Sequence, residues 1–161
     1  MKFKKIFTKN LKSPYQKFEF EKRVSEVRSM DGTTSMQKNI MVPKGWSQVA
    51  SDIMAQKYLR KDGIPQKDGS FTGEDDARQV FDRLSVCWRS WGEEFNYFDT
   101  KADAQNFEDE IKYMLANQMV APNSPQWFNT GLHSQYGITG PAQGHYFVNP
   151  KTQEIEKSTS A

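Results

Sequence analysis

The residues best suited to chemistry lie in the stretch APNSPQWFNTG, residues 121–131. Prolines restrict the backbone on both sides of Asn123 and Ser124, so the stretch predicts a rigid loop and not the middle of a helix. Trp127 and Phe128 follow at once, and large aromatic side chains of this kind favour burial. We therefore expect two rings to anchor the loop in the core, so that a serine hydroxyl is held in a fixed position.

A serine hydroxyl held in this way can bind a phosphate. The Ser124 hydroxyl and neighbouring backbone N–H groups would surround a phosphate oxygen, because oriented donors form an anion-binding concavity. Asn123 is a secondary candidate for the same site. The alternative is an ordinary turn, in which the serine and asparagine side chains bond to their own backbone. The residues alone leave both interpretations open.

The other reactive side chains give weaker signals. Cys87 is the single cysteine, so it cannot form an internal disulfide, and its apolar setting favours a role as a small core residue. His133 and His145 have no cysteines nearby, so the sequence predicts no metal site. The pairs Glu74-Asp75 and Glu93-Glu94 should point apart into solvent and not form a catalytic dyad.

Composition limits the class of protein. The 161 residues are enough for one domain with a core, and the aromatic content of 13% is high for a disordered chain. There is no apolar run of the ~20 residues that cross a bilayer, and residues 1–10 do not resemble a secretory leader. We expect no membrane association and a reducing, cytoplasmic setting.

Positive charge is concentrated near the amino terminus. Residues 1–28 carry nine Lys or Arg against three Asp or Glu, whereas the net charge of the whole chain is only +2. Residues 1–17 are therefore predicted to form a basic, flexible arm. Such an arm is compatible with a nucleic-acid partner or with a simple solvated tail.

Two kinds of element are expected to position the candidate loop. Residues 18–42 predict a β-hairpin that turns at Asp31-Gly32, with one side of its first strand formed by Phe18, Phe20, Lys22 and Val24. Residues 46–61 predict a helix whose buried face carries Trp46, Val49, Ala50, Ile53 and Met54. Residues 66–73 then predict an exposed loop.

A pair of longer helices follows. The first has a capping-box spacing at Thr72 and Asp75 and an apolar stripe, and Gly92 marks its end or a kink; the stripe is Ala77, Val80, Phe81, Leu84, Trp88 and Trp91. The second begins at Thr100, ends before Pro122 and buries Ala104, Phe107, Ile111, Met114 and Leu115. Residues 145–148 predict a short strand, and residues 151–161 show no periodicity. The fold class is thus mainly α with a small β portion (α+β).

Several segments together resemble a known family. FEKRVSEVR (20–28), VPKGWSQVASDIMAQKYLRKDGIP (42–65) and VFDRL (80–84) precede PNSPQWFNTGL and GPAQGHYFV in the order found in class II, adenosylcobalamin-dependent ribonucleotide reductases. The resemblance covers roughly residues 18–161. Its most specific part is PNSPQWFNTGL, which is similar to a Ser-Pro-Thr-hydrophobic-Phe-Asn segment of these enzymes.

The resemblance implies a function for Ser124. In the family, the corresponding serine contacts the substrate phosphate, so Ser124 is the residue to which this role is carried over. The family reduces ribonucleotides to deoxyribonucleotides by thiyl-radical chemistry, here as a ribonucleoside-diphosphate reductase with a thioredoxin-type dithiol as reductant. That chemistry needs at least three cysteines, and this chain has one. We therefore expect no catalytic residue in this chain, and adenosylcobalamin is expected to bind to the missing part of the enzyme.

The implied organisation has three parts: the arm at 1–17, a hairpin plus helical domain at 18–120, and the start of the catalytic barrel region at 121–161. The complete enzyme would have a ten-stranded α/β barrel that is mostly absent here, so the chain is either a truncated piece or one product of a split gene. The expected partners are the remainder of the reductase and a ribonucleotide, and a homodimer is left open. The alternatives are a non-catalytic helical binding module with a nucleic-acid-binding arm, and a structural piece in which Ser124 contacts nothing.

Overall fold

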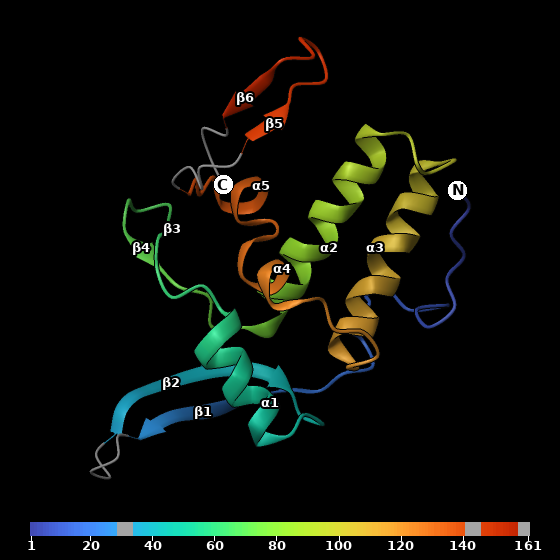
Figure 1. The fold of residues 1–161 in the computed structure, drawn as a ribbon. Coiled ribbons are helices and arrows are strands. Elements are labelled where there is room, and N and C mark those ends of the chain that lie inside the picture. The colour runs from blue at the N-terminus through green and yellow to red at the C-terminus, as the bar shows by residue number, and fades with distance from the viewer. Residues whose placement is uncertain (29–33, 141–145, 158–161) are drawn as a thin grey trace.

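An antiparallel helix pair dominates the computed structural model, which describes residues 1–28, 34–140 and 146–157 (Figure 1). Helix α2 spans Ala77–Glu94 and α3 spans Lys101–Ala116. The predicted start of α3 at Thr100 is confirmed, because the Thr100 side chain accepts a hydrogen bond from the Asp103 amide at 3.1 Å. The mainly helical, α+β character predicted from the sequence is also confirmed.

The start of α2 differs from the prediction. Its N-cap is Asp76, which forms a capping box with Gln79, and not the pair Thr72 and Asp75. Residues before Asp76 are extended, so the capping box lies closer to the first buried turn. At the other end, Gly92 lies inside α2 and packs against the ring of Phe98. The predicted stripe is buried from Ala77 to Leu84, but Trp88 is only partly buried and Trp91 is half exposed.

The predicted β-hairpin is present. Strand β1 (Phe20–Arg28) pairs antiparallel with β2 (Thr34–Pro43), with Arg23 opposite Ile40. The predicted turn at Asp31-Gly32 lies outside the described residues. Ile40 and Val42 of β2 are buried against α2 and continue the core.

Helix α1 (Gln48–Ile53) is shorter than predicted and buries a different face. It passes directly into a π-helical turn, η1 (Met54–Tyr58). Val49 and Ile53, which were predicted to be buried, are 67% and 40% exposed. The buried side of α1 carries Ser51 instead, which accepts a hydrogen bond from Arg23, and Ala55 and Leu59 of the following segment pack into the core.

The remaining elements are short. Helices α4 (Ser124–Asn129) and α5 (Leu132–Tyr136) follow α3 and lie against α2 (Figure 1). The predicted loop at 66–73 contains most of a small hairpin, β3 (Ile64–Pro65) with β4 (Phe71–Thr72). The predicted strand at 145–148 is present as β5 (Tyr146–Val148), and it pairs with β6 (Ile155–Lys157) in a segment that was expected to lack structure.

The core lies where the helix pair meets β2, η1 and α4. Phe81 occupies its centre and contacts the rings of Trp46 and Trp127. Cys87 is buried on α2, as the sequence predicted. Within the described ranges, no helix is both long and apolar enough to cross a membrane.

Residues 1–17 lie along α3 in the structure and do not extend freely into solvent (Figure 1). The Phe3 ring packs edge-on against Phe107, and Phe7 stacks on Tyr113. The buried Glu110 carboxylate accepts hydrogen bonds from the amides of Phe7 and Thr8 at 3.0 and 2.8 Å. The segment is therefore packed and not loose, although the three-part domain division itself stays a prediction.

Replacing Glu110 with alanine is expected to release this segment. Burial raises the pKa of Glu110, but hydrogen bonds from Thr8 and Phe7 outweigh it and leave the pKa below its ordinary value, so the carboxylate is charged at neutral pH. Hydrogen bonds to a charged group contribute about 1.5–3 kcal/mol each. Tryptic cleavage after Lys9 should therefore become about tenfold faster or more, whereas Glu94→Ala at an exposed site should leave the rate unchanged.

Candidate functional site

Ser124 is the first residue of helix α4, so the segment predicted to be a loop is partly helical. Asn123 caps this helix, with φ −64° and ψ 149°, and Pro125 occupies the first turn. A proline is accommodated in a first turn because its missing N–H would have no partner within the helix. The two prolines of the segment therefore define where the helix starts, and they do not exclude a helix.

The Ser124 hydroxyl faces another hydroxyl. Its Oγ lies 3.4 Å from the phenol oxygen of Tyr58, and either atom can be the donor. Tyr58 is the last residue of η1, and its ring stacks on Trp127 at 5.2 Å with an interplanar angle of 15°. Two hydroxyls from distant parts of the chain thus meet at the start of α4.

Sequence reasoning did not identify Tyr58. The one signal in the sequence was its position four residues after Met54, which would place both side chains on the same face of the predicted helix. The pairing itself joins residues 66 positions apart, and periodicity within one segment gives no information about such a contact. Tyr58 is therefore added to the candidate site by the structure alone.

The backbone amides near Ser124 already have partners. The Ser124 N–H donates to Asn123 Oδ1 at 2.9 Å, and the Gln126 N–H donates to the Asn123 carbonyl at 2.9 Å. Pro125 has no N–H. The donors best placed to meet a ligand are therefore the two hydroxyls, and the amides expected from the sequence are engaged in capping α4. Asn123 is exposed and acts as that cap.

The two predicted anchors differ in burial. Trp127 is 7% exposed and packs between Tyr58 and Phe81. Phe128 is 40% exposed and covers the Tyr58 ring at 5.5 Å. Trp127 therefore fixes α4 to the core, and Phe128 shields the outer side of the tyrosine.

A fully buried ion pair lies behind this site. Arg83 Nε on α2 donates to Glu74 Oε1 at 2.8 Å, and both side chains are inaccessible to solvent. The remaining nitrogens of Arg83 donate to three backbone carbonyls; these belong to Tyr58 (3.2 Å), Trp127 (2.7 Å) and Thr130 (2.7 Å). One guanidinium therefore joins the end of η1 to α4, and so fixes Tyr58 relative to Ser124.

Glu74 corrects the expectation that the Glu74-Asp75 pair is solvated. Glu74 precedes α2 in an extended segment, so its side chain can turn inward to Arg83. Its carboxylate also accepts from the Arg60 amide at 2.8 Å and from the Tyr136 hydroxyl at 3.0 Å. Burial, and then the neighbouring Glu74 charge, raise the pKa of Tyr136 well above its ordinary value, so Tyr136 stays protonated and remains a donor. A charge with this many partners is structural and not a free base.

The other predicted groups do not gather at the site. Cys87 is buried on α2, and His133 is exposed on α5. His145 lies outside the described residues. Among the residues that the structure describes, no three His, Cys, Asp or Glu side chains lie together as metal ligands would.

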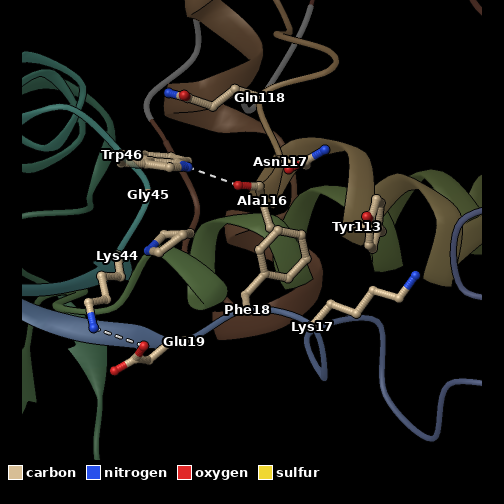
Figure 2. A pocket seen from close by; sticks show the side chains of 11 residues that line it. Lys17, Phe18, Glu19, Lys44, Gly45, Trp46, Tyr113, Ala116, Asn117 and Gln118 are labelled. Carbon is tan, nitrogen blue, oxygen red and sulfur yellow. Dashed lines mark hydrogen bonds and ion pairs between the residues drawn. The ribbon is translucent and has the colours of Figure 1, made fainter.

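Two cavities flank Trp46, whose indole N–H donates to the Ala116 carbonyl at 2.8 Å. The larger, of about 660 Å³, is drawn in Figure 2. Its Lys44 pairs with Glu19 at 3.0 Å, and its Lys17 lies over the ring of Tyr113. Both ammonium groups thus have partners within the chain. The smaller, of about 250 Å³, is mostly apolar and is bordered by Tyr58 and Trp127.

The sequence was compared with known proteins once this geometry was established. The sequence model of a family described as class II vitamin B12-dependent ribonucleotide reductase matches residues 21–118. Proteins named vitamin B12-dependent ribonucleotide reductase from Bradyrhizobium diazoefficiens and Agrobacterium fabrum are each 45% identical over the whole chain. One from Streptomyces avermitilis is 35% identical over 81% of the chain. The chain spans 15% of the length of the first two relatives and 13% of the third.

Proposed function

Because the chain belongs to the class II vitamin B12-dependent ribonucleotide reductases and corresponds to their amino-terminal region, we propose that it is part of an enzyme that reduces ribonucleotides to deoxyribonucleotides. The observation that supports this most directly is the 45% identity to two named reductases along its whole length. In this proposal the region supplies scaffold and a substrate-phosphate contact. The chain continues into a ten-stranded α/β barrel supplied by the rest of the enzyme.

The reducing chemistry is assigned to that remainder. Thiyl-radical reduction of a ribose needs a radical cysteine and a pair of cysteines that oxidise to a disulfide. The single cysteine, Cys87, is 4% exposed on α2, so it is not available to a substrate. A thioredoxin-type dithiol would reduce that disulfide back to two thiols. The product, a deoxyribonucleotide, would be a precursor for DNA replication.

Adenosylcobalamin does not fit the residues described here. A cavity of about 300–1,000 Å³ encloses a drug-sized ligand, and a corrin with its adenosyl group is larger than that. The cavity bordered by Tyr58 and Trp127 is about 250 Å³, and the larger one beside Trp46 is about 660 Å³. His133, a residue type that can ligate a metal, is exposed on α5, and no group of three His, Cys, Asp or Glu side chains lies together among the described residues. In this proposal the cofactor binds to the remainder of the enzyme, where it would generate the radical.

Ser124 is proposed to donate to a substrate phosphate oxygen, with Tyr58 beside it. The 3.4 Å separation of the two hydroxyl oxygens lets both point at one ligand oxygen. Burial of Trp127 and the Arg83 contacts hold both residues before substrate arrives, and groups positioned in advance bind at a lower entropic cost. Asn123 supports this arrangement by capping α4.

Reconstitution tests the proposed activity. The chain is mixed with a polypeptide that carries the rest of a class II reductase, adenosylcobalamin, a dithiol and a ribonucleotide, and deoxyribonucleotide is measured. We expect product only when both polypeptides are present. A well-folded complex that forms no product with either diphosphates or triphosphates would contradict the proposal.

In the reconstituted enzyme, Ser124→Ala is expected to weaken substrate binding by about 1.5–3 kcal/mol, because a hydrogen bond to a charged phosphate is lost. KM should rise by roughly 10- to 150-fold, given about 1.4 kcal/mol for each factor of ten. Ser70→Ala, in the exposed loop between β3 and β4, is the matched control and should leave KM unchanged. Equal KM values for all three proteins would instead identify Ser124 as a purely structural residue.

The nucleic-acid-binding alternative has less support. An arm that binds single strands would present aromatic rings to the bases, but Phe3 and Phe7 pack against α3. Lys5, moreover, pairs with Asp109 at 2.5 Å. Salt-dependent DNA or RNA binding that disappears when residues 1–17 are deleted would favour this alternative.

A further inference from the structure

Helix α1 exposes two of its apolar residues, Val49 and Ile53, next to the exposed Gln48, and it buries the polar side chain of Ser51. Val49 and Ile53 lie one turn apart and are 67% and 40% exposed. On the buried side, Ser51 donates to the Ser47 carbonyl at 3.0 Å and accepts from Arg23 at 3.2 Å. A helix on a solvent-facing surface normally has the opposite arrangement. The outer side of α1 is therefore built to be covered.

The exposed side of α1 continues into the smaller cavity. Ile53 forms part of its wall, together with Met54, Leu115 and Val120. Met119 and Phe128, at 44% and 40% exposure, belong to the two chain segments that border the cavity. We call this surface the α1 face; it consists of Val49, Ile53, Met119, Phe128 and the cavity that Ile53 borders. The cavity has a volume of about 250 Å³ and mostly apolar walls, so inserted apolar side chains suit it better than a polar ligand.

We propose that the α1 face docks an apolar segment from the part of the reductase polypeptide that lies outside this chain. This inference rests on the proposed function, because it requires that remainder to exist as a partner. The relatives have ample polypeptide for this role, since the chain covers only 15% of their length. Exposed apolar patches on folded domains mark interaction sites of this kind.

The position of the face supports this occupant. Tyr58 borders the cavity and its hydroxyl lies 3.4 Å from Ser124 Oγ. A segment docked here would therefore bring the rest of the enzyme beside the proposed phosphate contact. A second copy of the chain would need about 800 Å² of each partner to associate stably. Four exposed side chains around a small cavity do not supply that area, whereas the remainder of one enzyme also makes contact elsewhere.

The test is a binding measurement with the reductase remainder. Calorimetry compares the unsubstituted chain with the double variant Val49→Lys/Ile53→Lys, and we expect the Kd to rise at least tenfold. Val49 is 67% and Ile53 40% exposed, and a lysine at either position can extend its ammonium group into solvent, so the double variant should keep the circular dichroism spectrum and melting temperature of the original. The matched control is Phe71→Lys/Ile155→Lys, which adds the same charge at exposed apolar sites on the two small hairpins and should leave the Kd within threefold.

Each alternative has a distinct outcome. The proposal is overturned if the remainder does not bind at micromolar concentrations, or if the α1-face variant binds as tightly as the original chain. It is also overturned if sedimentation shows self-association that Val49→Lys/Ile53→Lys abolishes and the remainder cannot displace, because the occupant is then a second copy. A complex that the α1-face variant weakens, but that makes no deoxyribonucleotide, would sustain the docking surface and refute the proposed function.

Discussion

Arg83→Met should lower the free energy of unfolding by about 3–5 kcal/mol, because it leaves the buried Glu74 carboxylate without its cation. Both side chains are inaccessible to solvent, and their nearest atoms are 2.8 Å apart. A domain of this size is stable by only about 5–15 kcal/mol. The substitution should therefore remove a large part of the total stability.

The loss has a second source in the backbone. Arg83 donates to the carbonyls of Tyr58, Trp127 and Thr130, and methionine offers no donor to any of them. An unsatisfied buried polar group costs about 1–3 kcal/mol. Replacing Glu74 and Arg83 together with apolar residues should therefore not restore stability, in contrast to isolated buried ion pairs, where such replacement is often neutral.

Urea denaturation at neutral pH measures this effect. The control is Arg78→Met on the same helix, where the arginine is partly exposed, pairs with Asp76 and lies over Phe20. Exposed ion pairs contribute about 1 kcal/mol or less, so the control should lose far less stability. If the two variants unfold at the same urea concentration, the buried contacts of Arg83 do not contribute more to stability than an exposed ion pair does. Hydrogen exchange should also show faster opening of residues 124–131 in Arg83→Met than in the control.

The elements that periodicity predicted well are those that bury one continuous face. In α2 and α3, core residues such as Val80, Phe81 and Leu84 recur at helical spacing, and local caps at Asp76 and Thr100 start each helix. The spacing identified both helices and the cap of α3 at Thr100 was predicted correctly, whereas the cap of α2 was assigned to Thr72 and Asp75 and lies at Asp76. The β-hairpin follows in the same way from alternation and from the return strand ending at Pro43.

Periodicity gave wrong predictions where contacts between distant segments decide which side chains are buried. Arg83 follows Val80 by three residues and precedes Cys87 by four, so its spacing was that of a core position, yet a charged residue is normally assigned to the surface. Its burial depends on Glu74 and on carbonyls 25 to 47 positions away. On α1 the buried position belongs to Ser51, which accepts a hydrogen bond from Arg23 of β1, so an assignment from apolar spacing put Val49 and Ile53 on the wrong side.

Of the two hydroxyl groups in the candidate site, the sequence predicted one, that of Ser124. Ser124 stood out because of its rigid neighbours and its family resemblance. Tyr58 came from the tertiary structure, since nothing in its own segment indicates a partner 66 positions away. The prolines around Ser124 were correctly read as rigid, but rigidity is equally a property of the first turn of a helix.

Gly131→Ala should be the second strongly destabilising change, with an expected loss of about 2–5 kcal/mol. Gly131 separates α4 from α5 and has φ +82°, a conformation that costs other residues about 1–2 kcal/mol. An added Cβ would also overlap the Arg83 carbonyl oxygen and lie 2.7 Å from its carbonyl carbon. Relief of such overpacking typically costs a further 1–3 kcal/mol, roughly. Gly131 therefore lets the chain pass close to α2 at Arg83, whose side chain binds the carbonyls of Tyr58 and Trp127.

Gly137→Ala separates these two causes. Gly137 ends the same helix α5 with φ +70°, but an added Cβ there would meet no atom within 4 Å. Its loss should be limited to the conformational cost of about 1–2 kcal/mol. Urea denaturation of both variants gives the difference, which measures how closely α2 and the 130–132 backbone must approach. A Gly131→Ala variant no less stable than Gly137→Ala would show that the backbone of Arg83 and the 130–132 segment can move apart at no cost in stability.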